Sequence, residues 1–368
     1  MNYTTVNRRI LGCGFAFLPI NPESIPDLRA VSIVDITVNA LTCPLIILLN
    51  ILVMVAVKTK PQLRTKSNIA LACLAISDLL VGLLVQPLHI IKLSFLLNGQ
   101  MSIFCKLEEV SNFLTSKCLI ASSTHLILMS AERYAAVRHP FAYEDKVTEV
   151  RIIIVSGLAW LIALLLPTKD VFKTKTDSVG NLVVFIVVPI LLYLPAMIYF
   201  NCVVYKEVRR NEKQIAANQV SLEAKEKLLK NRKAFYTTTV VLLAFFACII
   251  PLNICFGIFA FTTDGNTANG RKTAIYLLPL MPVLNSLFNP LIYSVRIRYF
   301  RVAFIELLAK KTASQAEELV RKIFGPRQIG VIANVEQEQN IRASREDVQQ
   351  ENVTFDNGHE ITQYQQRH

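Results

Sequence analysis

Long apolar stretches separated by short polar connections dominate this sequence. Seven of them approach or exceed the roughly 20 helical residues needed to cross a hydrocarbon core of about 30 Å. Because lipid offers no hydrogen-bonding partners, stretches of this length predict helices rather than the shorter strands of a barrel. They cover residues 31–57, 67–91, 107–131, 151–167, 181–205, 234–262 and 273–295. The pattern predicts an all-α membrane protein built as a seven-helix bundle.

The segments around the bundle are polar. We expect residues 1–30 to form an N-terminal segment and residues 31–295 to form the bundle. Residues 296–308 alternate basic and apolar side chains at helical spacing, which predicts a short helix lying on the membrane. The remaining residues, 309–368, form a tail that we expect to be mostly disordered beyond about residue 326, where Gln, Glu, Asn and Arg prevail.

Composition and charge then exclude several classes of protein. With 53% hydrophobic and 18% charged residues, the chain does not resemble a soluble enzyme, in which about 25% of residues are charged. It also lacks a zinc-binding His-Glu-x-x-His helix, a Gly-x-Ser-x-Gly elbow and a phosphate-binding loop. The net charge of +12 could suggest nucleic acid, but its distribution favours another reading.

Most of the basic residues lie on one side of the predicted membrane. Of the 39 Lys and Arg residues, 28 fall in alternate connections, at 58–66, 132–151 and 206–233 and from 296 onward. The positive-inside rule therefore predicts a multi-pass membrane protein with its N-terminus outside and its C-terminus in the cytoplasm, and we expect it in the plasma membrane. A glycosylation sequon at Asn2 agrees with this orientation. The long connection 206–233 predicts helical extensions whose lysines and arginines contact anionic lipids, a cytoplasmic partner or both.

Polar residues inside the spans indicate where function resides. Asp78 lies in the middle of the second span, and a charge at that depth is a functional hypothesis by default. It could centre one hydrated network, although each neutral member could equally make an ordinary hydrogen bond between helices. The neutral candidates are Asn50, Ser122, Ser123, Asn285, Ser286 and Asn289.

Five features in order along the chain resemble the rhodopsin-like (class A) G-protein-coupled receptors. The resemblance covers about residues 30–305, and the features together are far more specific than any one alone. They are Asp78 with Pro87 in the second span, Glu132-Arg133-Tyr134 closing the third, Trp160 in the fourth, Pro251 in the sixth, and Asn289-Pro290 with Tyr293 closing the seventh.

The resemblance implies a receptor that binds an extracellular small molecule or peptide and activates a heterotrimeric G protein through the inner ends of spans three, five and six. It implies that Glu132 holds Arg133 until activation and that Tyr293 then swings inward. Pro251 would kink span six, with Phe245 as the aromatic residue below the kink. The resemblance also implies arrestin as a partner, and an allosteric sodium ion held by Asp78, Ser122, Asn285 and Asn289, with Asn50 in the same polar network.

The sequence departs from the family pattern in three places. Cys105 begins span three, yet the connection that normally supplies its disulfide partner, 168–180, has no cysteine. Either Cys13 is the partner or both thiols are free. Ile249 stands where the family has a switch tryptophan. Arg232 and Lys233, rather than an acid, begin span six, so we expect a weak restraint on Arg133 and measurable agonist-free signalling.

The sequence narrows the possible classes of ligand without naming one. Four residues of span three, Asn112, Thr115, Ser116 and Leu119, share one helix face and form the predicted pocket. Counted from Arg133, Thr115 stands where amine receptors carry an aspartate, and counted from Cys105, Asn112 does; both are uncharged, which argues against a classical monoamine. Val283 stands where opsins carry the retinal lysine, which argues against retinal. Polar residues that could bond either between helices or to a ligand are Gln86, His89, Asn253 and Tyr276.

The roles of four further charged residues remain open. Lys92 could pair with Glu108 or Glu109, or meet an anionic ligand, while either carboxylate could attract a basic one. Lys117 lies off the pocket face and either extends toward solvent or pairs inside the bundle. At the level of the whole chain, a transporter and a non-signalling scaffold or decoy receptor are the rival classes. The odd number of spans argues against a transporter built from two related halves.

Overall fold

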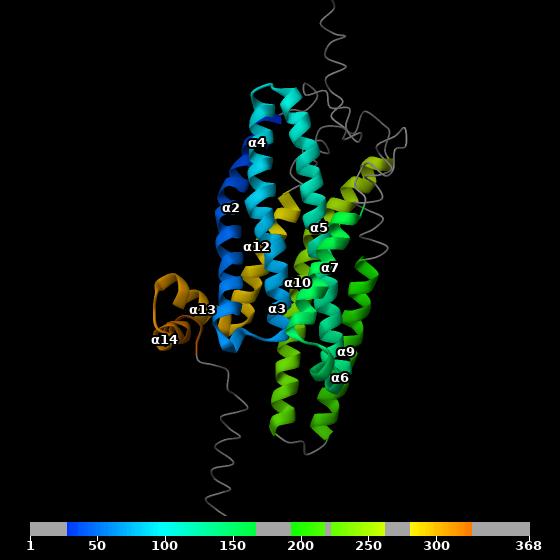
Figure 1. Cartoon of the computed structure of the whole chain (residues 1–368), viewed down its shortest axis with the longest axis vertical. Coiled ribbons are helices and arrows are strands. Elements are labelled where there is room, and N and C mark those ends of the chain that lie inside the picture. Colours follow the sequence, from blue (N-terminus) through cyan, green and yellow to red (C-terminus); the bar gives the residue numbers. More distant parts are fainter. Residues whose placement is uncertain (1–27, 167–192, 218–221, 262–279, 326–368) are drawn as a thin grey trace, which may run out of the picture. The chain divides into compact units, whose positions relative to one another are not determined.

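The computed structural model describes residues 28–166, 193–217, 222–261 and 280–325, and all regular structure within those ranges is helical (Figure 1). The seven predicted spans are all represented, so the chain is an all-α seven-helix bundle. The elements of the bundle are α2 (Leu28–Thr59), η2 (Pro61–Leu63), α3 (Lys66–Leu80), η3 (Val81–Val85), α4 (Gln86–Leu97), α5 (Met101–Arg138), α6 (Pro140–Lys146), α7 (Glu149–Leu165), α9 (Leu194–Ala217), α10 (Leu222–Phe261), α12 (Leu280–Arg296) and α13 (Arg298–Ala309).

The second span changes its helical winding half-way across the membrane. It consists of α3, the five-residue π-helical turn η3 and α4. Pro87 follows this turn, and a proline both lacks a backbone donor and displaces the preceding turn. The wider turn shifts which face α4 presents relative to α3.

Several spans extend beyond their apolar stretches. The helix α5 runs from Met101 to Arg138, beyond the predicted 107–131, because the charged residues that bound the apolar run, Lys106, Glu132 and Arg133, are good helix formers. The connection between spans five and six is helical, as predicted, since α9 extends to Ala217 and α10 begins at Leu222. The helix α10 continues through Pro251 to Phe261.

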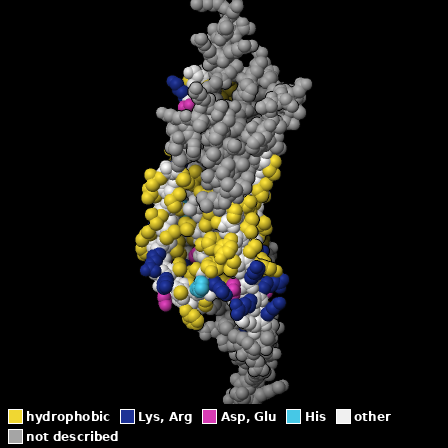
Figure 2. Space-filling view, turned by 90° about the vertical axis from the view of Figure 1, so that its right-hand side faces the viewer, with side chains coloured by type: hydrophobic (Ala, Val, Ile, Leu, Met, Phe, Trp, Pro, Cys, Tyr) yellow, Lys and Arg dark blue, Asp and Glu magenta, His cyan; other side chains and the backbone are white. Residues whose placement is uncertain are grey.

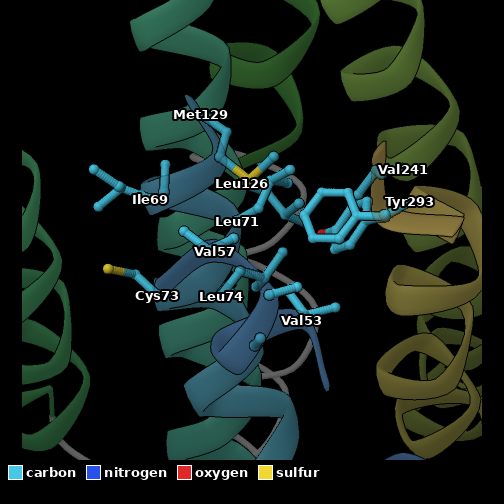
Figure 3. Close-up of a cluster of buried hydrophobic side chains, with 14 of the residues drawn as sticks. Val53, Val57, Ile69, Leu71, Cys73, Leu74, Leu126, Met129, Val241 and Tyr293 are labelled. Atoms are coloured by element: carbon cyan, nitrogen blue, oxygen red, sulfur yellow. The ribbon is translucent and has the colours of Figure 1, made fainter. Parts of the chain in front are cut away.

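The core of the bundle lies where α2, α3, α5, α10 and α12 meet. The side chains of Leu74, Leu126 and Val241 are completely buried there, and the ring of Tyr293 lies among them (Figure 3). Helix packing agrees with this arrangement, because α3 contacts both α2 and α5 while α10 contacts α12. The core thus joins segments of the chain that lie more than a hundred residues apart.

The outside of the bundle is apolar around its middle. Figure 2 shows hydrophobic side chains over one face, with Lys and Arg gathered toward one end. On α7, Ile153, Leu161 and Leu164 expose about half of their surface, an arrangement that suits lipid rather than water. By length and hydropathy alone, three described stretches qualify as spans, namely Arg29–Thr59, Lys66–Leu97 and Asn231–Pro251. The structure describes the predicted fifth and seventh spans only in part.

Beyond the bundle lies a second compact unit that begins at Thr312. Its helix α14 (Ala313–Phe324) was not predicted from the sequence. Thr312 caps it, since its hydroxyl accepts from the Gln315 amide while the Gln315 side chain accepts from the Thr312 amide. The predicted amphipathic helix after the bundle is present as α13, within the first unit. The expectation of disorder beyond residue 326 lies outside the described residues.

Candidate functional site

Asp78 is completely buried at the centre of the bundle and links α3 to α12. Its carboxylate accepts a hydrogen bond from the Ser286 hydroxyl at 2.7 Å and another from the Asn289 amide at 2.7 Å. Asn50 on α2 joins the same site by donating to the Ser286 carbonyl at 3.2 Å. Ser122 is one step away, because its hydroxyl donates to Ser77 at 3.1 Å.

The donors around Asp78 are all neutral, and several acceptors beside it lack a donor. The side-chain oxygens of Asn50, Asn285 and Asn289 are buried without a hydrogen-bonding partner in the described part of the chain. Unpaired buried oxygens are costly, and oxygen-only donor sets suit a hard cation. The residues present therefore fit the sodium ion that the resemblance implies, with Asp78 supplying the negative charge.

A second polar site lies at the C-terminal end of α5. We call this end of the bundle inner and the opposite end outer, after the predicted orientation. Arg133 pairs with its neighbour Glu132 in a two-point contact, with its Nε atom 2.5 Å from the carboxylate. Both side chains are about 9% exposed, so the pair is largely shielded from water. A shielded, bidentate guanidinium–carboxylate pair is strong and geometrically defined.

Two residues missed in the sequence complete this inner site. Tyr143 on α6 donates its hydroxyl to Glu132, and Ser67 at the start of α3 donates to the same carboxylate at 3.1 Å. Burial and the Glu132 charge raise the pKa of the Tyr143 phenol above its usual 10.0, so the hydroxyl stays a donor. No local motif marks Tyr143, because its role arises from the turn that brings α6 under α5.

A cavity of about 40 Å³ lies beside Arg133. Residues of α3, α5, α10 and the segment after α12 line it, including Ser67, Met129, Thr237, Thr238 and Ile297. No ion pair joins Arg133 to a described residue of α10; Arg232 instead lies 3.3 Å from Glu212 of α9. The inner ends of spans three and six are thus separated by a hollow rather than tied by charge.

The other predicted switch residues lie around these two sites. Tyr293 is completely buried, its hydroxyl has no described partner, and its ring lies 6.1 Å from that of Phe300 on α13. Phe245 belongs to the core below Pro251. Tyr134 turns away from Arg133, since its ring packs on Phe200 of α9 at 5.7 Å. Pro290 is buried within α12, and Ile249 fills part of the core.

The outer half of the bundle contains a network of charges between α4 and α5. Lys92 lies 2.6 Å from Glu108, and Asn112 donates to the same carboxylate at 3.3 Å. The open question about Lys92 is therefore answered in favour of Glu108. Of the predicted pocket face, Thr115 and Ser116 bond to backbone carbonyls of their own helix, and Leu119 packs against the core.

A buried carboxylate in the first span was overlooked. Asp35 is 2% exposed and lies 2.9 Å from the His89 ring, while Asn39 donates to its other oxygen at 2.6 Å. Gln86 extends the network, since it bonds to Thr42 at 2.8 Å. The rule that singled out Asp78 applies equally to Asp35, which stands near the outer end of a 27-residue apolar stretch. His89 and Gln86 accordingly bond between helices.

Lys117 is buried and binds within the bundle. Its ammonium group donates to the backbone carbonyls of Leu164 and Leu166, at 3.2 and 2.6 Å, and lies 5.2 Å from the centre of the Phe113 ring. Those carbonyls belong to the C-terminal end of α7, where helical carbonyls lack partners and a cation is favourable. The alternative of extension toward solvent is wrong, and Lys117 caps the fourth span.

Cys105 is disulfide-bonded, whereas five other cysteines are free: Cys43, Cys73, Cys118, Cys202 and Cys248. Cys13 lies outside the described residues, so its pairing with Cys105 stays a prediction. The sequon at Asn2 and the predicted pocket residue Tyr276 also lie outside the described residues, as does the side chain of Asn253. Glycosylation at Asn2 and the pocket roles of Tyr276 and Asn253 therefore stay predictions.

Comparison with known proteins decides the family. A family model described as "7 transmembrane receptor (rhodopsin family)" matches residues 49–293, which contain both polar sites. The chain belongs to this family. Membership makes it a multi-pass plasma-membrane receptor rather than an enzyme.

Individual relatives agree with this placement. The rat (Rattus norvegicus) histamine H2 receptor is 30% identical over 292 residues, which cover 72% of this chain and 76% of that receptor. The adenosine receptor A3 of Ovis aries is 26% identical over 321 residues, 79% of this chain and 93% of that receptor. The muscarinic acetylcholine receptor M5 of Mus musculus is 26% identical over 275 residues, 68% of this chain and 47% of that receptor.

Proposed function

We propose that this rhodopsin-family receptor activates a heterotrimeric G protein through the inner ends of α5, α9 and α10, in response to an extracellular small molecule or peptide bound between its helices. The observation that carries the proposal is the shielded Glu132–Arg133 pair beside the cavity that α3, α5 and α10 line. Release of Arg133 would present a rigid fork of donors to the backbone carbonyls of an inserted helix. Arrestin and membrane lipids are further proposed partners.

The proposed orientation places the Glu132–Arg133 end in the cytoplasm. Its support is the excess of basic residues on that side, including Arg209, Arg210 and Lys213 on the extension of α9. The ligand would enter from the opposite end, toward Asn112 and Thr115 on α5. This orientation also puts the Asn2 sequon outside the cell.

The side chains of the predicted pocket limit which classes of ligand it can bind. The relatives are named for histamine, adenosine and acetylcholine, which differ in charge and shape, so their names do not indicate one ligand class. Thr115 is uncharged, and the nearest carboxylate, Glu108, already pairs with Lys92. A ligand recognised through neutral hydrogen bonds fits this face better than a classical monoamine, and Val283 leaves no amine for a retinal Schiff base.

We also propose that Asp78, with Asn50, Ser122, Asn285 and Asn289, holds an allosteric sodium ion. The three donorless amide oxygens and the buried charge support this assignment. When bound, the ion would neutralise the carboxylate. The hydrogen bonds from Ser286 and Asn289 to Asp78 hold α12 against α3. A change in the spacing of these two helices would reach Tyr293, which lies one helical turn beyond Asn289.

The receptor proposal is tested by a ligand screen that uses thermal stabilisation of the purified chain, followed by nucleotide exchange on a panel of G proteins. We expect a stabilising compound to raise exchange in the intact chain and not in the Arg133→Ala variant. Binding without exchange on any G protein would favour a non-signalling scaffold or decoy receptor. Flux of the compound across vesicles would favour a transporter.

A further inference from the structure

The connection between α2 and α3 carries three cations that each reach a different element. Its backbone is well anchored, because the Thr65 side chain caps α3 and Asn68 bonds to the Leu63 carbonyl at 3.0 Å. The three ion pairs are Lys60 with Glu306 of α13, Arg64 with Glu149 of α7 at 2.8 Å, and Lys66 with Glu144 of α6 at 2.9 Å. The first inside connection therefore has a separate contact with each neighbour.

Lys66 makes the most extensive of these contacts. Besides the Glu144 carboxylate, its ammonium group donates to the backbone carbonyls of Glu144 at 3.2 Å and Tyr143 at 3.4 Å. It also lies 4.6 Å from the centre of the Tyr143 ring. These carbonyls are in the last turn of α6, where the partial negative charge of the helix end favours a cation, and the Tyr143 carbonyl also accepts from the Val147 amide at 3.0 Å. A helix of seven residues has little stability alone, so Lys66 helps to define where Tyr143 sits.

Tyr143 carries this positioning to the Glu132–Arg133 pair. Its hydroxyl donates to Glu132, and Ser67, the neighbour of Lys66, donates to the same carboxylate. The two donors orient the Glu132 carboxylate so that both of its oxygens face the Arg133 guanidinium. Span six offers no equivalent restraint among its described residues, since Arg232 and Lys233 stand at its inner end.

We propose that Lys66 and Tyr143 form a lock across the first and second inside connections, which positions Glu132 so that it retains Arg133 in the absence of ligand. Both are positioning residues, because they act on Arg133 through Glu132. The proposal rests on the assignment of Arg133 to G-protein coupling made above.

The structure ranks the effects of variants. The Glu144 side chain is 61% exposed, and exposed ion pairs contribute little, so Glu144→Gln should have a small effect. Lys66→Gln loses the charge at the helix end and the ring contact as well, and Tyr143→Phe loses the hydroxyl alone. Both should weaken the lock clearly, whereas Lys66→Arg keeps the charge and the donors. Arg64→Gln breaks an ion pair of the same connection that does not reach α6, and serves as the matched control.

The test measures the separation of α2 and α10 in the full chain reconstituted in nanodiscs. Spin labels are placed on cysteines at the exposed positions Lys58 and Lys233, with other accessible cysteines replaced by serine. For Lys66→Gln and Tyr143→Phe we expect the longer-distance population to grow roughly threefold or more without ligand. Lys66→Arg and Arg64→Gln should match the parent. Equal distance distributions for Tyr143→Phe and the parent would overturn the lock.

Nucleotide exchange on the same variants separates the lock from the receptor assignment. If the lock and the coupling proposal both hold, Lys66→Gln and Tyr143→Phe raise ligand-free exchange by roughly three- to tenfold. Longer distances with no exchange on any G protein would retain the lock and contradict the coupling proposal. Exchange that requires Arg133 but is unchanged by either variant would contradict the lock alone.

Discussion

At the scale of single residues, the buried charges of this chain are each met in a different way. Arg133 is paired with a neighbouring acid, Lys117 binds the carbonyls of a helix end, and Lys92 crosses to Glu108. Asp78 has no charged partner among the described residues, since its donors are the neutral Ser286 and Asn289 side chains. A buried charge without a counter-charge is costly, so a bound cation would stabilise the ionised form of Asp78.

The sodium assignment predicts a cation-specific stability. Sodium chloride should raise the apparent melting temperature of the purified receptor above that in choline chloride of equal ionic strength, because the ion binds the folded state. Asp78→Asn keeps the shape and removes the charge, so the sodium effect should disappear. Asp35→Asn, which alters another buried carboxylate, is the control and should keep it. An equal sodium effect in the Asp78→Asn variant would contradict the assignment.

Lys117 should contribute to stability through its cap on α7. Lys117→Met retains the apolar stem but leaves the Leu164 and Leu166 carbonyls without their donor, which should cost about 1–2 kcal/mol. The expected result is a lower apparent melting temperature in detergent, with Lys117→Arg close to the parent. A Lys117→Met variant as stable as the parent would show that water or lipid replaces the cap.

At the scale of elements, the second span depends on close packing at its π-helical turn. A Cβ atom on Gly82 would lie 2.9 Å from Ile47 Cγ1 and 3.1 Å from Ile46 Cγ2, so η3 and α2 approach one another there without room for a side chain. Gly157 on α7 has open space around the same position. Close packing therefore requires a glycine at position 82 but not at position 157.

These two glycines give a matched pair of variants. Gly82→Ala should destabilise the receptor by about 1–3 kcal/mol through overpacking. Gly157→Ala should be neutral or stabilise α7 by roughly 0.5–1 kcal/mol, because alanine loses less backbone entropy in a helix. Thermal unfolding of both purified variants checks the prediction. Equal stability of the two would mean that α2 moves to accommodate the added methyl group.

At the scale of elements, the sequence predicted which helices exist better than where each helix begins and ends. Apolar length is a strong signal, so all seven spans were expected, as was the helix α13. The ends were not, because Lys106 before the predicted third span and Glu132 and Arg133 after it interrupt the apolar run while α5 continues past them. The helix α14 was missed for a similar reason, since its stability depends on the Thr312–Gln315 capping box and not on an apolar run.

At the scale of the whole molecule, sites formed by residues distant in sequence were the hardest to predict. Asp78, Glu132 and Arg133 lie in local motifs, so the sequence alone singles them out as candidates. Tyr143 joins Glu132 only through the turn between α5 and α6, and Asp35 meets His89 across 54 positions. Such pairings depend on helix rotation and tilt, which an apolar pattern leaves open.

The orientation of the molecule and its disulfide can be checked together. An epitope at the N-terminus should be labelled on intact cells, whereas one at the C-terminus should require permeabilisation. Peptide mapping without reduction should yield a linked Cys13–Cys105 pair, because both would then lie on the outer side. Alkylation of both cysteines in the unreduced protein would contradict that pairing, and surface labelling of the C-terminus would contradict the orientation.

The central claim is that Arg133 transmits activation to a G protein. Its most direct test is guanine-nucleotide exchange by purified heterotrimeric G proteins on the full chain in nanodiscs, with and without a stabilising ligand. Arg133→Ala should abolish receptor-dependent exchange while ligand binding persists, and Arg29→Ala, at the exposed outer start of α2, should leave exchange unchanged. Full exchange by Arg133→Ala with a responsive G protein would contradict the account.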